Sequence, residues 1–284
     1  MISVIMPTHK KPPLLHATLL SVLSQGYEGF EFIVVDASPD GYFKDVFDSY
    51  YDNRLFLKKR NNFSKVRIIR PEENRGMPGC MKMTGFRNCT QDNDFCVFLD
   101  HDDFLYTDVL QHIHDADMLY PGRDMIGMDY TSMVYNNGRV YTNKKTYVGG
   151  EICGGLDTIW IDNIYYKFDG KQDVYRNIHP YKSPVHPEII SKKALREKRF
   201  TFVEDTETMD DCMFSVMSHA LSEIYIKAIG YVYVAYFGGN RTNSTIGRKI
   251  SNTVTHNHNV CESYDKMLDS LGYVKPRVIY DPFV

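Results

Sequence analysis

An acidic run at positions 100–103 (DHDD) contains the side chains best suited to carry chemistry, and it directly follows the apolar stretch 95–99 (FCVFL). In an extended backbone, Asp100 and Asp102 point to the same side. Two carboxylates at this spacing can bind Mg²⁺ or Mn²⁺, which neutralises charge on a phosphate leaving group. The pattern therefore predicts a metal site for a phosphate-bearing substrate. The alternative is that these acids cap a helix beginning near Phe104.

A further carboxylate, Asp36, ends the apolar run 31–36 (EFIVVD). A carboxylate at that place can accept a hydrogen bond from the ring N–H of a nucleobase or from a ribose hydroxyl. The alternative is that Asp36 only initiates the turn at 37–40 (ASPD).

The elements that would position these residues alternate between strand and helix patterns. Strand patterns cover residues 2–6, 31–36, 66–69 and 95–99, and helical patterns follow Pro12-Pro13 and cover residues 42–50 and 79–89. We expect Pro7 to stop the first strand. This order predicts a parallel sheet with helices on both faces, which binds ligands outside the carboxyl ends of its strands. The strand ends that carry polar residues are Thr8 with His9, Asp36, and the run at 100–103.

The second half of the chain is less regular. Strand patterns at 124–135 and 139–147 flank Asn136-Asn137-Gly138 and predict a hairpin. Further expectations are an irregular stretch at 149–187, helices at 188–198, 209–221 and 261–271, a β-rich segment at 224–236 that Gly230 breaks, and a polar loop at 238–259.

The composition is that of an ordinary globular protein: 284 residues and 33.0 kDa, with 43% apolar and 24% charged residues. No apolar run approaches the ~18 residues of a membrane helix, and the first residues lack the pattern of a signal peptide. The six cysteines form no CxxC pair, which argues against a zinc site or a disulfide framework and suits a reducing compartment. We therefore expect a cytoplasmic protein without a transmembrane segment.

Basic residues gather in two segments, although the net charge is only −3. Residues 54–70 hold seven basic residues and no acid, and residues 192–199 hold five basic residues and one acid. Such segments suit an anionic partner, or they are two solvated faces.

Several segments resemble glycosyltransferase family 2, whose members have the GT-A fold, and they occur in the family's order. They are 3–8 (SVIMPT), 21–25 (SVLSQ), 34–38 (VVDAS), 74–76 (NRG) with 86–88 (FRN), and 99–103 (LDHDD), which matches the family's DXD element. The resemblance is dense over 2–110, weaker over 120–190, and returns at 202–236. It implies an α/β, GT-A (Rossmann-like) fold with a mixed, mainly parallel sheet, helices on both faces and a small C-terminal acceptor and lid region. The implied parts of this single body are a nucleotide-sugar-binding half (1–120), an acceptor-side half with the catalytic acids (121–237), and a flexible loop with a C-terminal helix (238–284).

The resemblance implies a metal-dependent transferase that takes a sugar from a nucleotide-diphospho-sugar, commonly a UDP-sugar. By similarity, Pro7, Thr8 and Asp36 would contact the base. Asp100 would face the ribose or the sugar, and Asp102, with Asp100 beside it, would bind Mn²⁺ or Mg²⁺.

Other donor contacts implied by the resemblance come from basic side chains. Arg75 or Arg87 would meet the diphosphate, since a guanidinium matches phosphate through two hydrogen bonds. Arg87 could equally be a buried structural arginine. The polar C-terminal loop resembles the family's segment that closes over the donor, from which Arg241 or Arg248 would reach the phosphates. His256 would complete the metal shell, with a surface histidine as the alternative.

Inverting members of the family use a carboxylate, placed in an acidic pair before a helix, to remove the proton of the acceptor hydroxyl. The pair Asp210-Asp211 has the better context because a helical pattern follows it directly, although the family has Glu at the first position. We expect Asp211 to be the base and Asp210 its neighbour, with Glu204-Asp205 as the alternative pair. Either pair could instead only complement a helix dipole.

The acceptor would bind near residues 145–190, and three classes stay open. They are a sugar on a surface polysaccharide or lipid-linked glycan, a hydroxymethylated cytosine in phage DNA, and a protein side chain. The basic segments would suit DNA, and the expected compartment is the cytoplasm of a bacterium or of a phage-infected host. The alternative function is a nucleotidyltransferase or a non-catalytic nucleotide-binding module; the absence of glycine from residues 8–13 disfavours the former.

Overall fold

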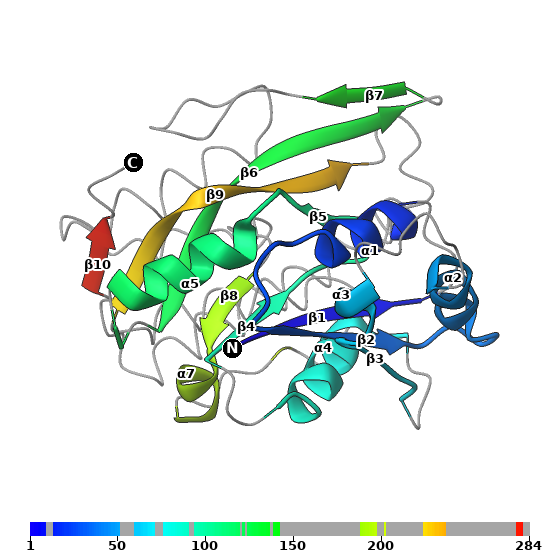
Figure 1. Cartoon of the computed structure of the whole chain (residues 1–284), viewed down its shortest axis with the longest axis horizontal. Coiled ribbons are helices and arrows are strands. Elements are labelled where there is room, and N and C mark those ends of the chain that lie inside the picture. The colour runs from blue at the N-terminus through cyan, green and yellow to red at the C-terminus, as the bar shows by residue number, and fades with distance from the viewer. Residues whose placement is uncertain are drawn as a thin grey trace, which may run out of the picture.

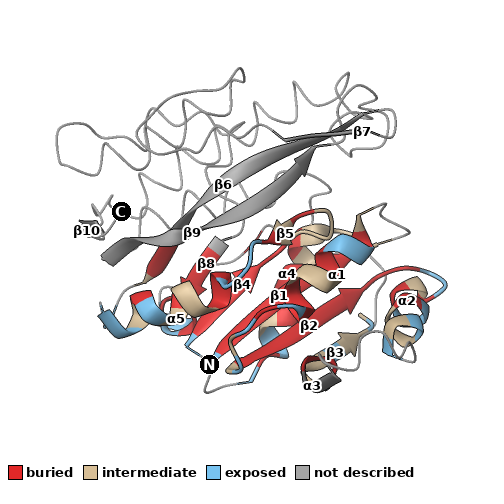
Figure 2. Ribbon diagram, turned by 45° about the horizontal axis from the view of Figure 1, so that its top comes forward, coloured by how far each residue is buried: buried red, intermediate tan, exposed pale blue. Residues whose placement is uncertain are grey.

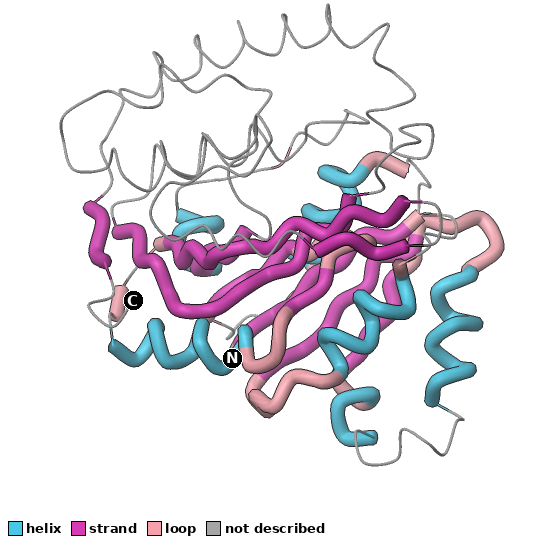
Figure 3. Tube along the Cα trace, turned by 90° about the horizontal axis from the view of Figure 1, so that it is seen from above, coloured by secondary structure: helices cyan, strands magenta, loops and turns pink. Residues whose placement is uncertain are grey.

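In a computed structural model of the chain, the described residues form one mixed, mostly parallel sheet with helices on both faces, as predicted (Figures 1 and 3). The described residues are 1–9, 14–51, 60–71, 76–90, 94–119, 121–122, 124–136, 139–142, 188–197, 202, 224–236 and 277–280. Only the backbone is described for residues 60, 61, 127–136, 139–142, 188, 224–236 and 277–280.

Short apolar strands form the centre of the sheet. They are β1 (Ile2–Thr8), β2 (Phe30–Asp36), β3 (Val66–Ile69) and β4 (Phe95–Phe98), which run parallel in the order β3-β2-β1-β4. Every residue of β1, β2 and β4 is buried (Figure 2), because helices or neighbouring strands cover both faces. The chain moves outward from β1 to β3 and then returns to the other side of β1. The strand order therefore reverses between β1 and β4, and open α/β sheets bind ligands in the crevice at such a switch point.

The prediction that Pro7 stops the first strand is wrong, because β1 continues to Thr8. The amide of Leu99 donates to the carbonyl of Ile5, so the odd-numbered residues of β1 direct their backbone groups toward β4. The pairing of β1 with β4 ends at Ile5 and Phe98. The nitrogen of Pro7 thus lies on a side where no ladder partner is needed, and a proline is tolerated there.

Helices form where three of the helical patterns predicted them: α1 (Leu15–Leu23), α2 (Tyr42–Tyr51) and α4 (Pro78–Arg87). Two others, α3 (Arg60–Phe63) and α5 (Val109–Leu119), were not predicted. Helix α4 packs against β1 and β2, and Gly85 permits its close approach. A Cβ atom on Gly85 would lie only 2.3 Å from Cγ2 of Ile5.

Strands from the second half extend the same sheet beyond β4. They are β6 (Met125–Asn136), β8 (Glu188–Ser191), β9 (Ile224–Tyr236) and β10 (Arg277–Tyr280), in the order β10-β9-β6-β8-β4. The predicted hairpin is formed by β6 and β7 (Arg139–Thr142). β9 continues through Gly230, where its register with β6 shifts, so the predicted break is an irregularity within one strand.

The helix predicted over 188–198 is wrong in its first part, where the chain forms β8 between β4 and β6. Ile189 and Ile190 are buried there, and packing within the sheet overrides local helical tendency. Helix α7 (Lys192–Glu197) follows, and Ser191 Oγ accepts the amide of Ala194 at 3.1 Å.

The remaining sequence expectations, at 149–187, 209–221, 238–259 and 261–271, lie outside the described residues. The three-part division of the chain stays a prediction. Among the described residues, no helix is long and apolar enough to cross a membrane.

Candidate functional site

Polar side chains from three neighbouring strands meet the carboxyl edge of the sheet at the switch point. Thr8 and Asp36 are register partners at the ends of β1 and β2. Asp100 follows β4, on the other side of β1, by two residues. Because adjacent strands lie about 4.8 Å apart, the three residues come from a stretch of the edge roughly 10 Å wide.

Two buried oxygen atoms at this edge have no hydrogen-bond partner in the described part of the chain: Oγ1 of Thr8 and Oδ2 of Asp36. The side chains are 0% and 1% exposed. The other carboxylate oxygen of Asp36 accepts the amide of Ser38 at 2.9 Å, which is the turn role considered above. An unpaired buried carboxylate oxygen costs about 1–3 kcal/mol or more, so its retention here indicates a ligand that supplies the missing partner.

The loop after β2 is held against this edge by two side chains. Arg70 Nη2 donates to the carbonyl of Ser38 at 2.7 Å, and Gly41, at φ 69°, leaves room for the guanidinium. Nδ1 of His9 lies 3.0 Å from the carbonyl of Ala37. The loop that directly follows Asp36 is therefore held by two side chains. The sequence patterns did not single out Arg70.

The acidic run forms a turn in which the amide of Asp103 donates to the carbonyl of Asp100 at 3.1 Å. The backbone is therefore not extended, and the argument that extension aligns Asp100 with Asp102 is wrong. Thr18 of α1 donates through Oγ1 to the carbonyl of His101 at 2.8 Å. This bond fixes the turn to the helix that covers the switch point.

The alternative that the acids cap a helix near Phe104 is also wrong. Strand β5 (Phe104–Leu105) follows the acidic turn and pairs with β9. The next helix, α5, begins only at Val109.

Lys82 of α4 is a site residue that the sequence patterns did not reveal. Its side chain is 1% exposed, and Nζ lies 3.2 Å from Oδ1 of Asp100. Nζ also lies 5.0 Å from the ring centroid of Phe202. The carboxylate and the ring face stabilise a cation that burial would otherwise penalise. The sequence signal is a lysine on the buried face of α4, three residues from both Gly79 and Gly85.

Phe202 brings a distant segment to the acidic turn. It is 1% exposed and makes an edge contact with Phe98, the last residue of β4, at 4.8 Å between ring centroids. Phe202 therefore lies beside Lys82, whose ammonium group pairs with Asp100. The expected acid pairs, Glu204-Asp205 and Asp210-Asp211, follow in sequence and lie outside the described residues.

Of the basic residues expected at the site, only Arg87 is among the described residues, and it does not lie at the site. Arg87 is exposed at the C-terminal end of α4, whose following residues pack at the amino edge, so it does not meet the acidic turn. It is not a buried structural arginine either. Arg75, Arg241, Arg248 and His256 lie outside the described residues.

The carboxylates of the acidic turn fit a hard divalent cation by their chemistry. Asp100 already has an ammonium group at 3.2 Å, so Asp102 is the better candidate ligand. Within the described ranges, no three His, Cys, Asp or Glu side chains gather into a site that could hold a metal ion by themselves.

The basic segments noted in the sequence are partly used inside the protein. Lys65 pairs with Glu28 at 2.6 Å, and its side chain is 16% exposed. Lys192 is 1% exposed and donates to the carbonyl of Thr90. These two cations are therefore not available to an external phosphate.

The fold is similar to that of solved glycosyltransferases. S. aureus TarS 1–349 in complex with UDP-GlcNAc matches with a TM-score of 0.56 and 17% identity, over 86% of this chain and 61% of that chain. The same fragment in complex with UDP matches with a TM-score of 0.54 and 16% identity, over 82% and 60%. The chain thus spans about three fifths of the TarS fragment. At this identity the likeness concerns the fold, and it confirms the predicted GT-A class.

The sequence comparison concerns the residues that build the site. No curated protein sequence matches the chain. The family pattern described as Glycosyl transferase family 2 matches residues 3–152, more than half of the chain, and includes β1, β2, β4 and the acidic turn. The chain therefore belongs to glycosyl transferase family 2.

Proposed function

We propose that the protein is a metal-dependent, inverting glycosyltransferase that moves a sugar from a UDP-sugar to an acceptor hydroxyl. The observation that carries this proposal is the pair of buried oxygens on Thr8 and Asp36, which lack partners among the described residues, next to the acidic turn at the switch point. A nucleoside supplies what the pair lacks. The carboxylate of Asp36 would accept the ring N–H of uracil, and the hydroxyl of Thr8 would pair with a base carbonyl, beside Pro7.

The diphosphate would lie over the acidic turn. Asp102, with Asp100 beside it, would hold Mn²⁺ or Mg²⁺, which supplies charge neutralisation for the departing diphosphate. Lys82 would keep Asp100 in place through their ion pair. Arg75 is our proposed cationic contact from the polypeptide.

The C-terminal loop would complete the donor site. Arg241 or Arg248 would reach the phosphates when this loop closes, and His256 would join the metal shell. Closure would also exclude water from the sugar.

The base that accepts the acceptor proton would come from the segment after Phe202. Asp211 is our proposed base and Asp210 its neighbour, with Glu204-Asp205 as the other pair. The position of Phe202 beside Lys82 supports this, because Asp211 lies nine residues on, within a reach of about 30 Å. As this carboxylate takes the proton, the acceptor oxygen attacks the anomeric carbon from the face opposite the diphosphate, and the configuration inverts.

For the acceptor we propose a sugar on a surface or lipid-linked glycan rather than a modified DNA base. The DNA hypothesis drew on the two basic segments, and Lys65 and Lys192 from those segments are engaged inside the protein. TarS, solved in complex with UDP-GlcNAc, supports UDP as the nucleotide.

The test is a panel of UDP-sugars with Mn²⁺, using glycan and hydroxymethylated DNA acceptors, on the wild type and on Asp211→Asn. We expect transfer to fall about 10²–10⁴-fold in the variant. UDP affinity should stay unchanged, because the base does not contact the nucleotide. Asp205→Asn is the matched control and should retain activity.

Two results would revise the proposal. A loss confined to Asp205→Asn would move the base to the other pair. Nucleotide binding without transfer to any acceptor, and without hydrolysis of any donor, would instead favour a non-catalytic binding module.

A further inference from the structure

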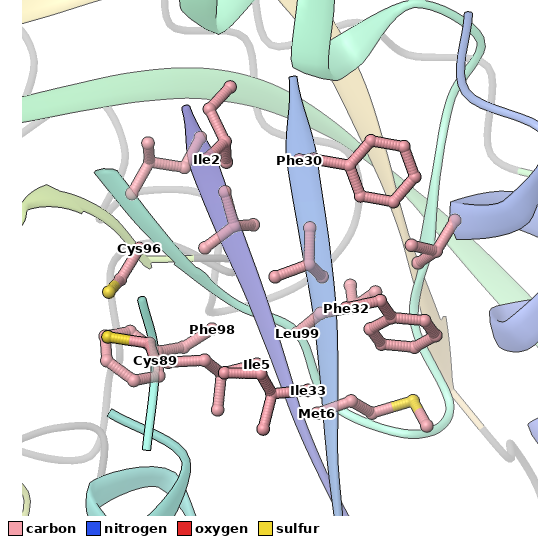
Figure 4. Close-up of a cluster of buried hydrophobic side chains, with 14 of the residues drawn as sticks. Ile2, Ile5, Met6, Phe30, Phe32, Ile33, Cys89, Cys96, Phe98 and Leu99 are labelled. Atoms are coloured by element: carbon pink, nitrogen blue, oxygen red, sulfur yellow. The ribbon is translucent and has the colours of Figure 1, made fainter. Parts of the chain in front are cut away.

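Two cysteines face each other at the amino edge of the sheet, the edge opposite the acidic turn. Cys89 follows α4, and Cys96 lies in β4. Figure 4 shows their sulfur atoms close to one another within the buried cluster, and each thiol shifts the pKa of the other. When protonated, Cys89 also donates to the carbonyl of Phe86 at 2.9 Å.

The charged groups around this pair come from three further elements. Lys192 of α7 is 1% exposed and donates to the carbonyl of Thr90, and its positive charge contributes to lowering the pKa of Cys89. Glu31 of β2 is the neighbouring acid, and Arg67 of β3 lies 3.7 Å from its carboxylate and offsets part of its charge. A negative charge on Cys89 would therefore face a buried ammonium group.

The two thiols differ in access and in acidity. Cys89 is 5% exposed and Cys96 is 0% exposed, so a small reagent from solution meets Cys89 first. The hydrogen bond from Cys96, followed by Lys192, lowers the pKa of Cys89 to about 6. Burial, with the hydrogen bond to Cys89, raises the pKa of Cys96. The outer cysteine is thus the thiolate, and the inner one keeps its proton.

We propose that Cys89 and Cys96 form a reactive thiol pair, in which a hydroperoxide oxidises Cys89 and Cys96 resolves the product as an intramolecular disulfide. The thiolate of Cys89 attacks one peroxide oxygen, so that an S–O bond forms and the O–O bond breaks. With hydrogen peroxide, the leaving hydroxide takes one proton from solvent and departs as the first water. The sulfur of Cys96 then attacks the sulfenic sulfur of Cys89, the S–S bond forms, and the S–O bond breaks. Its proton leaves with the hydroxyl as the second water, and two electrons have passed from sulfur to peroxide.

The experiment treats the full-length chain with hydrogen peroxide at pH 7 and maps the cysteines by mass spectrometry, with dimedone present to trap sulfenic acid. In the wild type we expect a peptide pair joined through Cys89 and Cys96, lighter by two hydrogen atoms and restored by dithiothreitol. Cys96→Ala should yield the dimedone adduct on Cys89 instead. Cys80→Ala, which removes a half-buried thiol on α4, is the matched control and should still form the disulfide.

A second measurement follows the alkylation rate of Cys89 by iodoacetamide against pH. We expect a midpoint near pH 6 in the wild type and a higher midpoint in Cys96→Ala and in Lys192→Met. The proposal is overturned if Cys89 is oxidised no faster than Cys80, if Cys96→Ala gives no adduct, or if the midpoint does not move. These readouts do not use sugar transfer, so they stand apart from the proposed function.

Discussion

The two edges of the central strands are both polar and both contain a buried lysine, yet they are completed differently. At the amino edge, Glu31 accepts hydrogen bonds from Ser3 Oγ at 2.6 Å and from the amide and hydroxyl of Thr90 at 2.7 and 2.9 Å. At the carboxyl edge, Thr8 and Asp36 each keep an oxygen without a partner among the described residues. A buried polar cluster that satisfies itself is structural, whereas one left incomplete is arranged for something that binds.

Replacing one acid at each edge by its amide gives the largest expected difference in UDP affinity between the two edges. Asp36→Asn replaces the unpaired acceptor by a donor, and we expect UDP affinity to fall about 10–100-fold, since a hydrogen bond to a charged group contributes about 1.5–3 kcal/mol. Glu31→Gln should lower the free energy of unfolding by about 1–3 kcal/mol and leave UDP affinity unchanged. Calorimetric titration measures the UDP affinity of each variant, and urea unfolding measures its free energy of unfolding. If the two variants lose affinity equally, the edges do not differ in function.

The buried lysines sharpen the same contrast. Lys82→Met removes the partner of Asp100, and we expect kcat/KM for transfer to fall roughly tenfold or more with little change in stability, because Asp100 is 34% exposed and screened. Lys192→Met should instead lower the free energy of unfolding by about 3 kcal/mol and leave kcat/KM unchanged. Steady-state kinetics and unfolding curves on both variants test this. A kinetic defect in Lys192→Met alone would contradict it.

The central strands and the site's position could be predicted from the sequence because both depend on local patterns. Continuous apolar runs mark buried parallel strands, and Asp36 and Asp100 follow such runs directly. The sequence predictions that were wrong concern residues whose structure depends on neighbours distant in sequence. Pro7 is tolerated in β1 because the pairing of β1 with β4 has already ended at Ile5. Residues 188–191 form a strand because they pair with β4 on one side and with β6 on the other.

The site residues that sequence patterns missed have the same origin. Lys82 looks like any helical lysine until α4 packs on β1 and β2 and places its ammonium group beside Asp100 and Phe202. Arg70 gains its role only when β3 lies beside the loop after β2. The local sequence can show that such a side chain is unusual, but it does not reveal partners that lie far along the chain.

Two substitutions in β1 should change stability in opposite directions. Thr8→Val removes a hydroxyl that has no partner in the described structure, so we expect the free energy of unfolding to rise by about 1 kcal/mol while UDP binding weakens. Ser3→Ala removes the donor to Glu31 and should lower the free energy of unfolding by about 1 kcal/mol. Thermal unfolding in the absence of nucleotide compares them. Equal destabilisation by both would remove the distinction between the edges.

A last expected effect is a pH dependence of stability confined to the amino edge. The pKa of Cys89 is lowered from 9.0 to about 6, mainly by the hydrogen bond from Cys96. Its thiolate therefore stabilises the fold fully above pH 9, and this contribution is lost as pH falls toward 6. Relative to Cys89→Ala, the wild type should gain stability between pH 6 and 9 in urea unfolding. A difference that does not change with pH would contradict the assignment.

A crystal structure with a bound UDP-sugar and Mn²⁺ most directly tests whether the carboxyl edge, with its unpaired oxygens on Thr8 and Asp36, is a nucleotide site. We expect base atoms within hydrogen-bond distance of Thr8 Oγ1 and Asp36 Oδ2, with the diphosphate over the turn at 100–103. A nucleotide bound elsewhere, with those two oxygens still unpaired, would contradict it.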